Sequence, residues 1–366
     1  MNDRELQKYI GEEDITVVEA MKKIDWNSCG VLYIIDKSGK LTGSLTDGDI
    51  RRWIIKTGDL TGRASQMQNR DVKYASEDES KRLDYLMKSR KITSIPVVDK
   101  KGHIKDIVFL ADQGDNENFD NHTLSGIPII IMAGGKGTRL YPYTKILPKP
   151  LIPIGDIPIL ERILNRFCEF GAHEFYLTVN YKKEMIKSYF NDLKPDYILH
   201  YVEEEKPLGT AGSIRLIEKR FDTPVFITNC DILIEEDYGK ILEYHRDSGN
   251  ALTVVSSLKN IIIPYGVLHS QERGVLTSIE EKPQLSYFIN TGMYLINPQY
   301  LDKIPDDTFY HMTNLAEQLM EDGCQVGMYP VSENSFLDMG EFEEMKRMEE
   351  LLGHGIDVKS IVKDDN

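Results

Sequence analysis

The pattern of apolar and polar positions divides most of the chain into strand-like and helix-like stretches that alternate from residue 127 onward. Short runs rich in Ile, Val, Leu, Phe and Tyr, the pattern of strands buried on both faces, occupy residues 127–133, 174–180, 197–203, 224–229 and 251–257. Helix-like stretches lie at residues 159–172, 182–192, 212–221 and 235–249. Strands that alternate with helices predict an α/β fold with a mostly parallel sheet, covered by helices on both faces.

The first third of the chain contains an internal repeat. Residues 34–49 (IIDKSGKLTGSLTDGD) align without gaps onto residues 97–112 (VVDKKGHIKDIVFLAD), and Asp36, Gly39 and Asp49 recur at the same positions in the second copy. Each copy reads as a strand, an Asp-Lys-x-Gly turn and a second strand. Helical stretches precede the two copies, near residues 16–24 and 80–90. We expect an α+β module of two similar units that pack as a pseudo-symmetric pair and share one core.

A polar segment separates this module from the α/β part. Residues 113–126 (QGDNENFDNHTLSG) are rich in Asn, Asp and Gly and have almost no apolar content, which is typical of a loop or linker. The chain has 366 residues, enough for two or three domains. We therefore predict one domain over residues 1–122 and another over residues 127–353.

The composition of the chain argues against some classes of binding partner. The net charge of −15 argues against a broad nucleic-acid or anionic-membrane surface, because such a surface needs a basic face. The polar N-terminus lacks a signal-peptide core, and no apolar run approaches the ~18 residues of a membrane span. The four cysteines lie far apart without a C-x-x-C pair, which suits a reducing compartment. We expect a cytoplasmic protein that binds neither nucleic acid nor a membrane.

The end of the first predicted α/β strand carries a glycine turn with cations around it. Gly134, Gly135 and Gly137 allow the backbone to approach a ligand and to turn its N–H groups toward phosphate oxygens, and Lys136 and Arg139 add full positive charges. Ligands of parallel sheets bind at the carboxyl ends of the strands, where this turn lies. The turn does not match a Walker A loop, which needs Gly-Lys-Ser/Thr, or a G-x-G-x-x-G dinucleotide fingerprint.

With its flanking residues, this turn resembles the signature of the sugar-1-phosphate nucleotidyltransferases. The resemblance covers about residues 127–353 and rests on seven motifs in order. The motifs are GGKGTRLYPYTKILPKPLIPI (Gly134–Ile154), EEKPLGTAGS (Glu204–Ser213), NCDIL (Asn229–Leu233), YGV (Tyr265–Val267), EKP (Glu281–Pro283), NTGMYLINP (Asn290–Pro298) and FLDMGEFEEM (Phe336–Met345). It implies a Rossmann-like, GT-A-like nucleotidyltransferase domain and an Mg²⁺-dependent reaction, in which a nucleoside triphosphate and a sugar 1-phosphate give a nucleotide sugar and pyrophosphate.

The resemblance also implies roles for individual residues. Arg139 and Lys149 would contact the reacting phosphates, and Asp231 would act with them as a catalytic residue. Asp231 and Asp338 would hold Mg²⁺, which prefers carboxylate oxygens and substrate phosphates. The implied nucleotide-binding residues are Gly134, Gly135, Lys136, Gly137, Thr138, Glu204, Gly209 and Thr210. The implied residues of the sugar-phosphate side are Gly266, Glu281, Lys282, Asn290 and Gly292. Cys230 we interpret as a small buried residue rather than a nucleophile.

The choice of base depends on Glu204, five residues before Gly209 in the loop that resembles the base-binding loop of the family. A carboxylate can accept two parallel hydrogen bonds from guanine N1–H and N2–H₂, whereas uracil and thymine offer one N–H between two carbonyls. This favours GTP. UTP, dTTP and CTP remain alternatives, because Glu203 and Glu205 are adjacent and the register is open.

The N-terminal repeat resembles a tandem CBS-domain pair, also called a Bateman module. In that family a Thr and an Asp hold the ribose of an adenine nucleotide, which implies Thr46 and Asp49 here, with Asp112 in the second copy. Phe109 stands where the second Thr would be, which puts that second site in doubt. AMP or ATP is therefore one expected ligand, and a pair that only mediates dimerisation is the alternative. We expect a homo-oligomer.

This domain combination resembles guanylyltransferases of bacterial surface-sugar pathways, and the legionaminic-acid type, acting on glucosamine 1-phosphate, shares its layout. A different class of function is a catalytically inert nucleotide sensor. The presence of Arg139, Lys149, Asp231 and Asp338 argues against it, because an inert relative would be expected to lose some of these residues. A GT-A glycosyltransferase is disfavoured, because NCDIL contains no D-x-D site.

Overall fold

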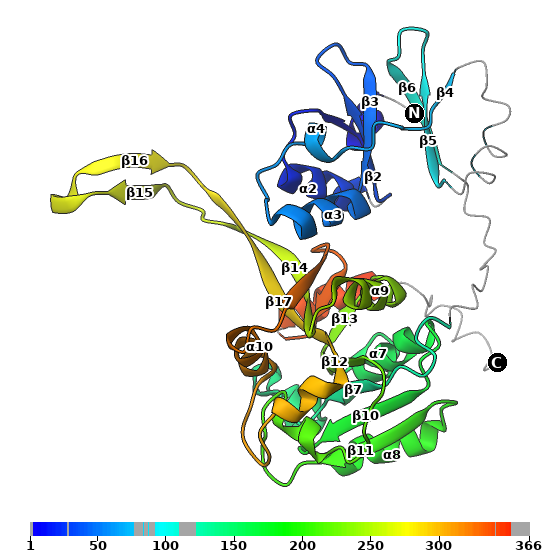
Figure 1. The fold of residues 1–366 in the computed structure, drawn as a ribbon, viewed down its shortest axis with the longest axis vertical. Helices are drawn as coiled ribbons and strands as arrows, with labels where there is room; N and C mark the ends of the chain where they lie inside the picture. The colour runs from blue at the N-terminus through cyan, green and yellow to red at the C-terminus, as the bar shows by residue number, and fades with distance from the viewer. Residues whose placement is uncertain are drawn as a thin grey trace, which may run out of the picture. The chain divides into compact units, whose positions relative to one another are not determined.

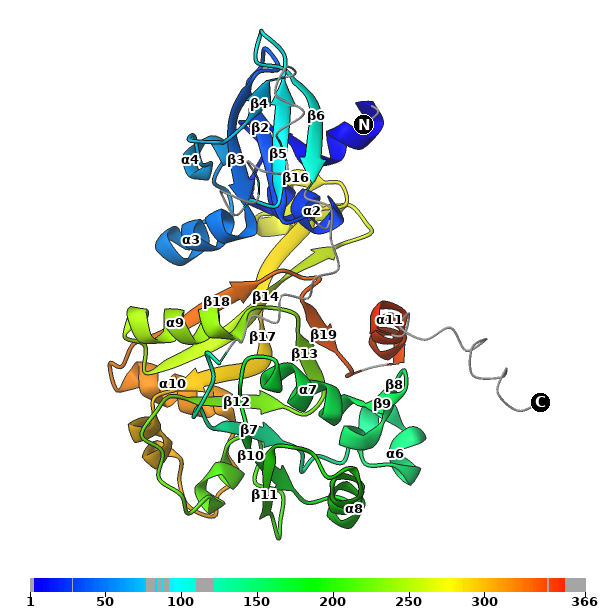
Figure 2. The ribbon, with the colours of Figure 1, turned by 90° about the vertical axis from the view of Figure 1, so that its right-hand side faces the viewer.

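The computed structural model describes residues 3–27, 29–76, 83, 87, 92–109, 122–340 and 342–352. The chain forms two compact units, and each is described by itself (Figures 1 and 2). The first unit contains Met1–Glu117 and Leu258–Tyr287, and the second contains Asn118–Ser257 and Phe288–Asn366. The segment Leu258–Tyr287, which lies inside the predicted range 127–353, therefore belongs to the first unit.

The first unit confirms the internal repeat. Its six strands are β1 (Ile10–Glu12), β2 (Val31–Ile35), β3 (Leu41–Thr46), β4 (Ala75–Ser76), β5 (Ser94–Val98) and β6 (Ile104–Phe109). In each copy the first strand pairs in parallel with the second, and the second pairs antiparallel with the third. Even the register shift recurs, between Ile34 and Ile35 in one copy and between Val97 and Val98 in the other. The helices are α1 (Asp3–Leu6), η1 (Gln7–Tyr9), α2 (Val17–Asn27), α3 (Asp47–Thr57) and α4 (Ala64–Met67).

The two copies share one core, as predicted. Side chains from both, among them Val31 and Tyr33 from β2 and Val98 from β5, pack in a single buried cluster. Tyr33 shares a hydrogen bond of 2.9 Å with Ser94 across the pair. At the turns, the N–H of Leu41 donates to the carbonyl of Gly102 at 3.0 Å. The predicted helix at residues 80–90 lies outside the described residues, except for positions 83 and 87.

The second unit is an α/β structure around a seven-stranded, mostly parallel sheet with the order β11-β10-β7-β12-β17-β14-β18. These strands are β7 (Ile129–Met132), β10 (Glu174–Val179), β11 (Ile198–Glu203), β12 (Val225–Asn229), β14 (Leu252–Ile262), β17 (Gln284–Ile296) and β18 (Val326–Val331). β17 runs antiparallel to β12, whereas the pairs β7–β10, β10–β11, β7–β12 and β14–β18 are parallel. The central strand β7 is buried on both faces, as its apolar run predicts.

Helices cover both faces of this sheet (Figures 1 and 2). Ile129 and Ile131 of β7 point into one core cluster and Ile130 and Met132 into another, which is the period of two expected for a strand. The first cluster packs against α7 (Ile159–Cys168), α8 (Lys183–Leu193), α9 (Tyr238–Ser248) and α11 (Phe342–Leu352), and the second against α10 (Met312–Glu321) and the 3-10 helix η7 (Pro298–Lys303). None of the helices in the described ranges has the length and apolar character needed to cross a bilayer.

Two expectations about local structure are wrong. The stretch 212–221 forms only the short 3-10 helix η5 (Gly212–Leu216). A Cβ at Gly212 would lie 2.3 Å from the carbonyl oxygen of Thr308, so tertiary packing sets this backbone. The strand β11 is not buried on both faces, because it lies at the edge of the sheet and exposes Ile198 to solvent.

Candidate active site

Three parallel strands bring their carboxyl ends to one edge of the sheet. Met132 at the end of β7 lies beside Thr178 of β10 and Asn229 of β12. The segments that follow these strands therefore meet, and a cavity of about 390 Å³ opens among them. Ten of the predicted site residues line it: Gly134, Gly135, Gly137, Thr138, Arg139, Lys149, Glu204, Gly209, Thr210 and Asp231.

The glycine turn has a backbone that a larger residue would disturb. Gly137 has φ +63°, and a Cβ there would lie 2.9 Å from Thr144 Cγ2 and 3.0 Å from Lys149 Cβ. After it, the 3-10 helix η3 (Thr138–Leu140) buries Leu140 in the core. Arg139 stays exposed at the cavity. The turn thus offers backbone N–H groups and one guanidinium to a ligand.

Lys149 is a buried cation that lines the cavity. It begins the 3-10 helix η4 (Lys149–Leu151), lies between Pro148 and Pro150, and is only 8% exposed. The prolines limit the backbone and so aim the side chain. Lys149 Nζ forms an ion pair with Asp231 Oδ2. Breaking such a buried pair by removing one partner leaves an uncompensated charge.

The two predicted metal-binding carboxylates lie close together although they are far apart in the sequence. Asp231 precedes β13 (Ile232–Ile234), which pairs antiparallel with β19 (Phe336–Asp338) and places Ile232 opposite Asp338. The N–H of Met339 donates to the carbonyl of Asp231 at 2.8 Å. Burial, and then the charge of Asp231, raise the pKa of Asp338, while Lys149 and Arg139 act in the opposite direction.

This donor set fits Mg²⁺. Asp231 and Asp338 are two neighbouring carboxylates, and oxygen donors of this kind suit a divalent cation. The described residues contain no cluster of three or more His, Cys, Asp or Glu side chains that could hold a metal. Mg²⁺ does not need such a cage, because it commonly binds one or two carboxylates and completes its coordination with substrate phosphates and water.

Glu204 lines the same cavity and is 6% exposed. Burial raises its pKa. Its Oε2 accepts the N–H of Leu208 at 3.3 Å, which favours the ionised form. The hydroxyls of Ser213 and Thr178 also lower this pKa, although neither makes a hydrogen bond of normal geometry to any described residue. A Cβ at Gly134 would lie 2.5 Å from Glu204 Oε1, so glycine makes room for the carboxylate.

The neighbouring glutamates are placed differently. Glu203 pairs with Lys183 and Lys187 of α8, and neither Glu203 nor Glu205 lines the cavity. Of the three neighbouring glutamates, Glu204 is therefore the one that lines the cavity.

The loop after Glu204 is held in place by a distant segment. Gly209 has φ +79°, and a Cβ there would lie 2.5 Å from the carbonyl oxygen of Tyr310. The N–H of Tyr310 donates to the carbonyl of Leu208 at 2.9 Å, and the N–H of Met312 donates to Thr210 Oγ1 at 3.1 Å. These bonds fix the loop against residues about a hundred positions away.

Some predicted residues do not line the cavity. Lys136 is exposed beside it. Gly292 has φ +89°, and a Cβ there would lie 2.3 Å from Asn229 Nδ2, so Gly292 adjoins a residue that does line the cavity. Asn290 donates from Nδ2 to the Tyr294 hydroxyl at 2.7 Å.

The remaining residues of the predicted sugar side belong to the first compact unit. Gly266 and Glu281 lie together there, because a Cβ at Gly266 would lie 3.0 Å from Glu281 Oε2. Lys282 follows with φ +49°. Their role at the sugar phosphate stays a prediction.

The predicted nucleotide contacts of the repeat module also stay predictions. Thr46 and Asp49 form a capping box at the start of α3, in which the N–H of Asp49 donates to Thr46 Oγ1 at 3.2 Å and the N–H of Thr46 donates to Asp49 Oδ2 at 2.9 Å. Asp49 also pairs with Arg52. Asp112 lies outside the described residues.

Sequence reasoning missed several cavity residues, among them Thr178, Asn229 and Phe309. Asn229 ends a strand at the binding edge, so the position of strand ends could have indicated it. Thr178 looks like an ordinary strand residue, and Phe309 comes from a loop without a motif. Cys230 lines the cavity, but burial, and then Asp231, raise the pKa of its thiol to about 12, which makes it unreactive.

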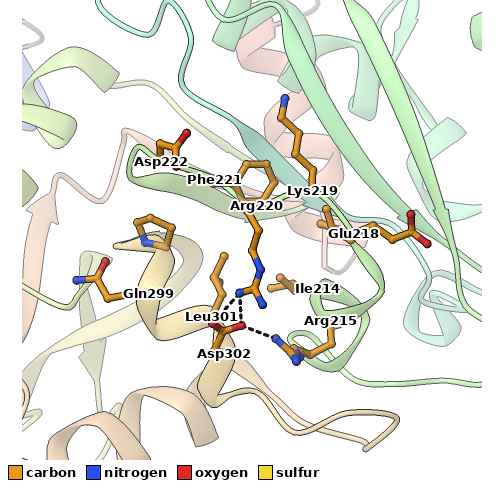
Figure 3. A pocket seen from close by; sticks show the side chains of 12 residues that line it. Ile214, Arg215, Glu218, Lys219, Arg220, Phe221, Asp222, Gln299, Leu301 and Asp302 are labelled. Atoms are coloured by element: carbon orange, nitrogen blue, oxygen red, sulfur yellow. Dashed lines mark hydrogen bonds and ion pairs between the residues drawn. The ribbon is translucent and has the colours of Figure 1, made fainter.

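A second cavity, of about 530 Å³, lies between η5 and η7 (Figure 3). Arg215 and Arg220 both reach Asp302, at 2.7 Å each, and Lys219 pairs with Glu174 at 2.7 Å. Each of these three basic lining residues thus has a carboxylate partner, and the cavity offers no surplus of positive charge to a phosphate.

Comparisons with known proteins agree with this geometry. Residues 128–353 match the family model described as nucleotidyl transferase, and residues 12–56 match the CBS domain. The mannose-1-phosphate guanyltransferase of Debaryomyces hansenii is 33% identical over 184 residues, which cover 48% of this chain and 51% of that protein. The UTP–glucose-1-phosphate uridylyltransferase of Synechocystis is 31% identical over 214 residues, which cover 53% of this chain and 55% of that protein.

Among solved structures, HddC from Yersinia pseudotuberculosis is 26% identical, with a TM-score of 0.48, covering 62% of this chain and 99% of that one. The chain spans about half the length of the curated relatives it matches. The nucleotidyl transferase model nevertheless covers more than half of this chain, from the glycine turn to the segment after Asp338. The protein therefore belongs to the nucleotidyl transferase family and carries a CBS domain near its N-terminus.

Proposed function

We propose that this protein transfers a nucleotidyl group from a nucleoside triphosphate, with GTP favoured, to a sugar 1-phosphate and releases pyrophosphate. The observation that carries the proposal is the single cavity that gathers the glycine turn, Arg139, the Lys149–Asp231 pair and Glu204. Candidate phosphate-binding groups and a buried carboxylate line the same cavity. The family and its sugar-1-phosphate relatives agree with this reaction.

The chemistry requires two polyanions to approach each other. An oxygen of the sugar phosphate attacks the α-phosphorus, a new P–O bond forms, and the bond from the α-phosphorus to the bridging oxygen breaks, so that pyrophosphate leaves with the electron pair. Such a reaction depends mainly on positioning and on charge stabilisation. Backbone N–H groups of the turn, Arg139 and Lys149 supply that stabilisation. The attacking phosphate is already ionised at neutral pH, so no strong general base is needed.

We propose that Asp231 and Asp338 hold Mg²⁺. When bound, the ion would neutralise charge on the phosphates and fix their orientation. The ion pair between Lys149 and Asp231 holds the two side chains together in the wall of the cavity.

Glu204 supports GTP as the favoured substrate. Its carboxylate is the group that would accept guanine N1–H and N2–H₂, and it is fixed by burial and by the N–H of Leu208. UTP, dTTP or CTP is the alternative, and one of the matching relatives is a uridylyltransferase. We further propose a cytoplasmic role in the synthesis of surface-glycan precursors, with AMP or ATP as a candidate ligand of the CBS module.

A pyrophosphate-release assay tests the function. The full-length protein is incubated with Mg²⁺, one of four nucleoside triphosphates, and glucosamine, mannose or glucose 1-phosphate, with and without AMP. We expect release that needs both reactants and is fastest with GTP. Release with none of these pairs would contradict the proposal and favour the inert sensor. Fastest release with UTP or dTTP would keep the reaction and overturn the assignment of the base.

A further inference from the structure

Two buried hydroxyl groups, those of Thr178 and Ser213, make no hydrogen bond of normal geometry to any of the described residues. Both residues are 0% exposed. A buried hydroxyl without a partner loses its hydrogen bonds to water, and an apolar side chain of the same size would avoid this loss. Such a group in a folded protein therefore needs an explanation, and a functional one is available here.

Both hydroxyls come from elements that surround Glu204. Thr178 of β10 lies opposite Val202 of β11, and the N–H of Glu204 continues this ladder with a bond of 3.0 Å to β10. Because positions two apart in a strand share a face, Glu204 lies on the same side of the sheet as Val202 and Thr178. The helix η5 packs on this side too, since its Ile214 belongs to the same core cluster as Val202, and it carries Ser213.

The carboxylate of Glu204 needs hydrogen-bond donors, because burial disfavours its charge. Burial has the largest effect on the pKa of Glu204 and raises it, whereas the N–H of Leu208 and the hydroxyls of Ser213 and Thr178 lower it. All three of these groups are uncharged donors. Thr178 lines the cavity together with Glu204, and Ser213 does not line it.

We propose that Thr178 and Ser213 are positioning residues of the base site, whose hydroxyls donate to Glu204 and keep its carboxylate ionised and directed at the base. This inference rests on the proposed role of Glu204 as the acceptor of guanine N1–H and N2–H₂. Without the hydroxyls, the buried carboxylate would take up a proton at a higher pH. A protonated carboxyl group can no longer accept both N–H groups of guanine.

Other titratable and charged groups of the surrounding elements are not among the groups that shift the pKa of Glu204. Several of them have partners elsewhere: Glu203 pairs with Lys183 and Lys187, Lys206 with Asp307, and Arg215 with Asp302 and Asp306. The others are Lys136 and Arg139 after β7, Glu205, and His311, whose Nδ1 lies 3.3 Å from Thr210 Oγ1. They are common to all variants compared below, so their titration cancels.

The test compares Thr178→Val, which removes the hydroxyl and keeps the shape of the side chain, with Thr178→Ser, which keeps the hydroxyl. Calorimetry gives the dissociation constants of the full-length protein for GTP and for UTP, with Mg²⁺ and without a sugar phosphate, between pH 5.5 and pH 8.5. The ratio of these two constants measures the preference for guanine, and we call the pH at which this preference falls to half its plateau the midpoint.

We expect Thr178→Val to raise the midpoint by about one pH unit, because the loss of one hydrogen bond to a charged group is worth roughly tenfold. Ser213→Ala should shift the midpoint in the same direction, and Thr178→Ser should keep the original midpoint. Thr228→Val is the matched control. Thr228 is also 0% exposed but lies on the face of β12 that carries Phe226, in the other core cluster, and does not line the cavity. Its midpoint should not change.

Circular dichroism verifies that each variant is folded. If Glu204→Gln abolished the preference but the midpoint stayed unchanged in Thr178→Val or Ser213→Ala, the role of that hydroxyl would be overturned and the role of Glu204 would stand. Equal weakening of GTP and UTP binding at every pH would also overturn the inference, because the hydroxyl would then be only structural. If Glu204→Gln left the preference intact, both this inference and the assignment of the base would fall, while the pyrophosphate-release assay would still judge the transfer reaction.

Discussion

At the scale of single residues, the ion pair between Lys149 and Asp231 is the centre of the proposed chemistry. Lys149→Met keeps the length of the side chain and removes its charge. We expect kcat to fall by about 10²- to 10³-fold, the loss typical when one stabilising group is removed from a transition state. Steady-state pyrophosphate release measures this.

Lys145→Met is the matched control, because Lys145 is exposed and does not line the cavity. Its activity should stay within about twofold of the original. Similar losses in both lysine variants would mean that the positive charge of the segment, rather than the position of Lys149, matters.

The pKa of Glu204 predicts how the preference for GTP depends on pH. Burial raises this pKa above its usual value, so a proton neutralises the carboxylate in a range where other glutamates are still ionised. Guanine needs the ionised acceptor. The ratio of kcat/KM for GTP to that for UTP should therefore fall as the pH falls from about 7.5 toward the raised pKa.

Glu204→Gln should remove this pH dependence and lower the GTP preference at every pH. Glu205→Gln, in which the changed side chain lies outside the cavity, should leave both unchanged. If the Glu204→Gln variant kept the original ratio of kcat/KM for GTP to kcat/KM for UTP and the original pH dependence of this ratio, Glu204 would not recognise the base.

At the scale of elements, the loop over Leu208–Ala211 depends on glycine at one position. Gly209→Ala would force a side chain into φ +79° and to within 2.5 Å of the carbonyl oxygen of Tyr310. We expect a loss of unfolding free energy of about 1–3 kcal/mol and a KM for the nucleotide raised at least tenfold. Gly249 has a similar positive φ, +69°, but open space around a Cβ, so the Gly249→Ala variant should lose less unfolding free energy and keep the KM of the original protein. Equal losses of stability and equal changes in KM in the two variants would show that the close contact with Tyr310 does not account for the effect of Gly209→Ala.

The helices and strands also show which features of the fold can be predicted from the sequence. The apolar run of β7 and the turn after it were predictable, because a buried strand and a group of glycines are local signals. The repeat was predictable for the same reason, down to the turns at Asp36 and Asp99, each of which accepts two backbone N–H groups. Asp231 and Asp338 required the family resemblance, because only the pairing of β13 with β19 brings them together.

The features that local signals could not predict depend on tertiary contacts. Phe309 enters the cavity wall because its neighbour Tyr310 bonds to the loop after Glu204. The stretch 212–221 has a helical pattern, but the close approach of Thr308 to Gly212 limits it to one short turn of helix.

At the scale of the whole molecule, a buried histidine links stability to pH. His245 is 1% exposed, and its Nδ1 lies 2.8 Å from Thr253 Oγ1. Burial lowers its pKa. Below the usual value of about 6.5, the unfolded chain binds a proton that the folded chain does not, so the free energy of unfolding falls as the pH falls from about 6.5 toward the lowered pKa.

His245→Gln tests this link. The melting temperature of the original protein should fall more between pH 7.5 and pH 5.5 than that of the variant, because the variant has no group at this position to protonate. Other titrating groups are common to both proteins and cancel in the comparison. If the melting temperatures of the two proteins changed in parallel with pH, His245 would not contribute to the pH dependence of stability.

The central claim is that an oxygen of a sugar phosphate attacks the α-phosphorus of a nucleotide held in the cavity lined by Arg139, Lys149 and Asp231. The most direct measurement uses a sugar 1-phosphate labelled with ¹⁸O in its phosphate, with GTP, and follows the products by mass spectrometry. We predict labelled nucleotide sugar and unlabelled pyrophosphate, and loss of both products in Asp231→Asn. Unlabelled GMP with pyrophosphate and no nucleotide sugar, or full turnover by Asp231→Asn, would contradict the account.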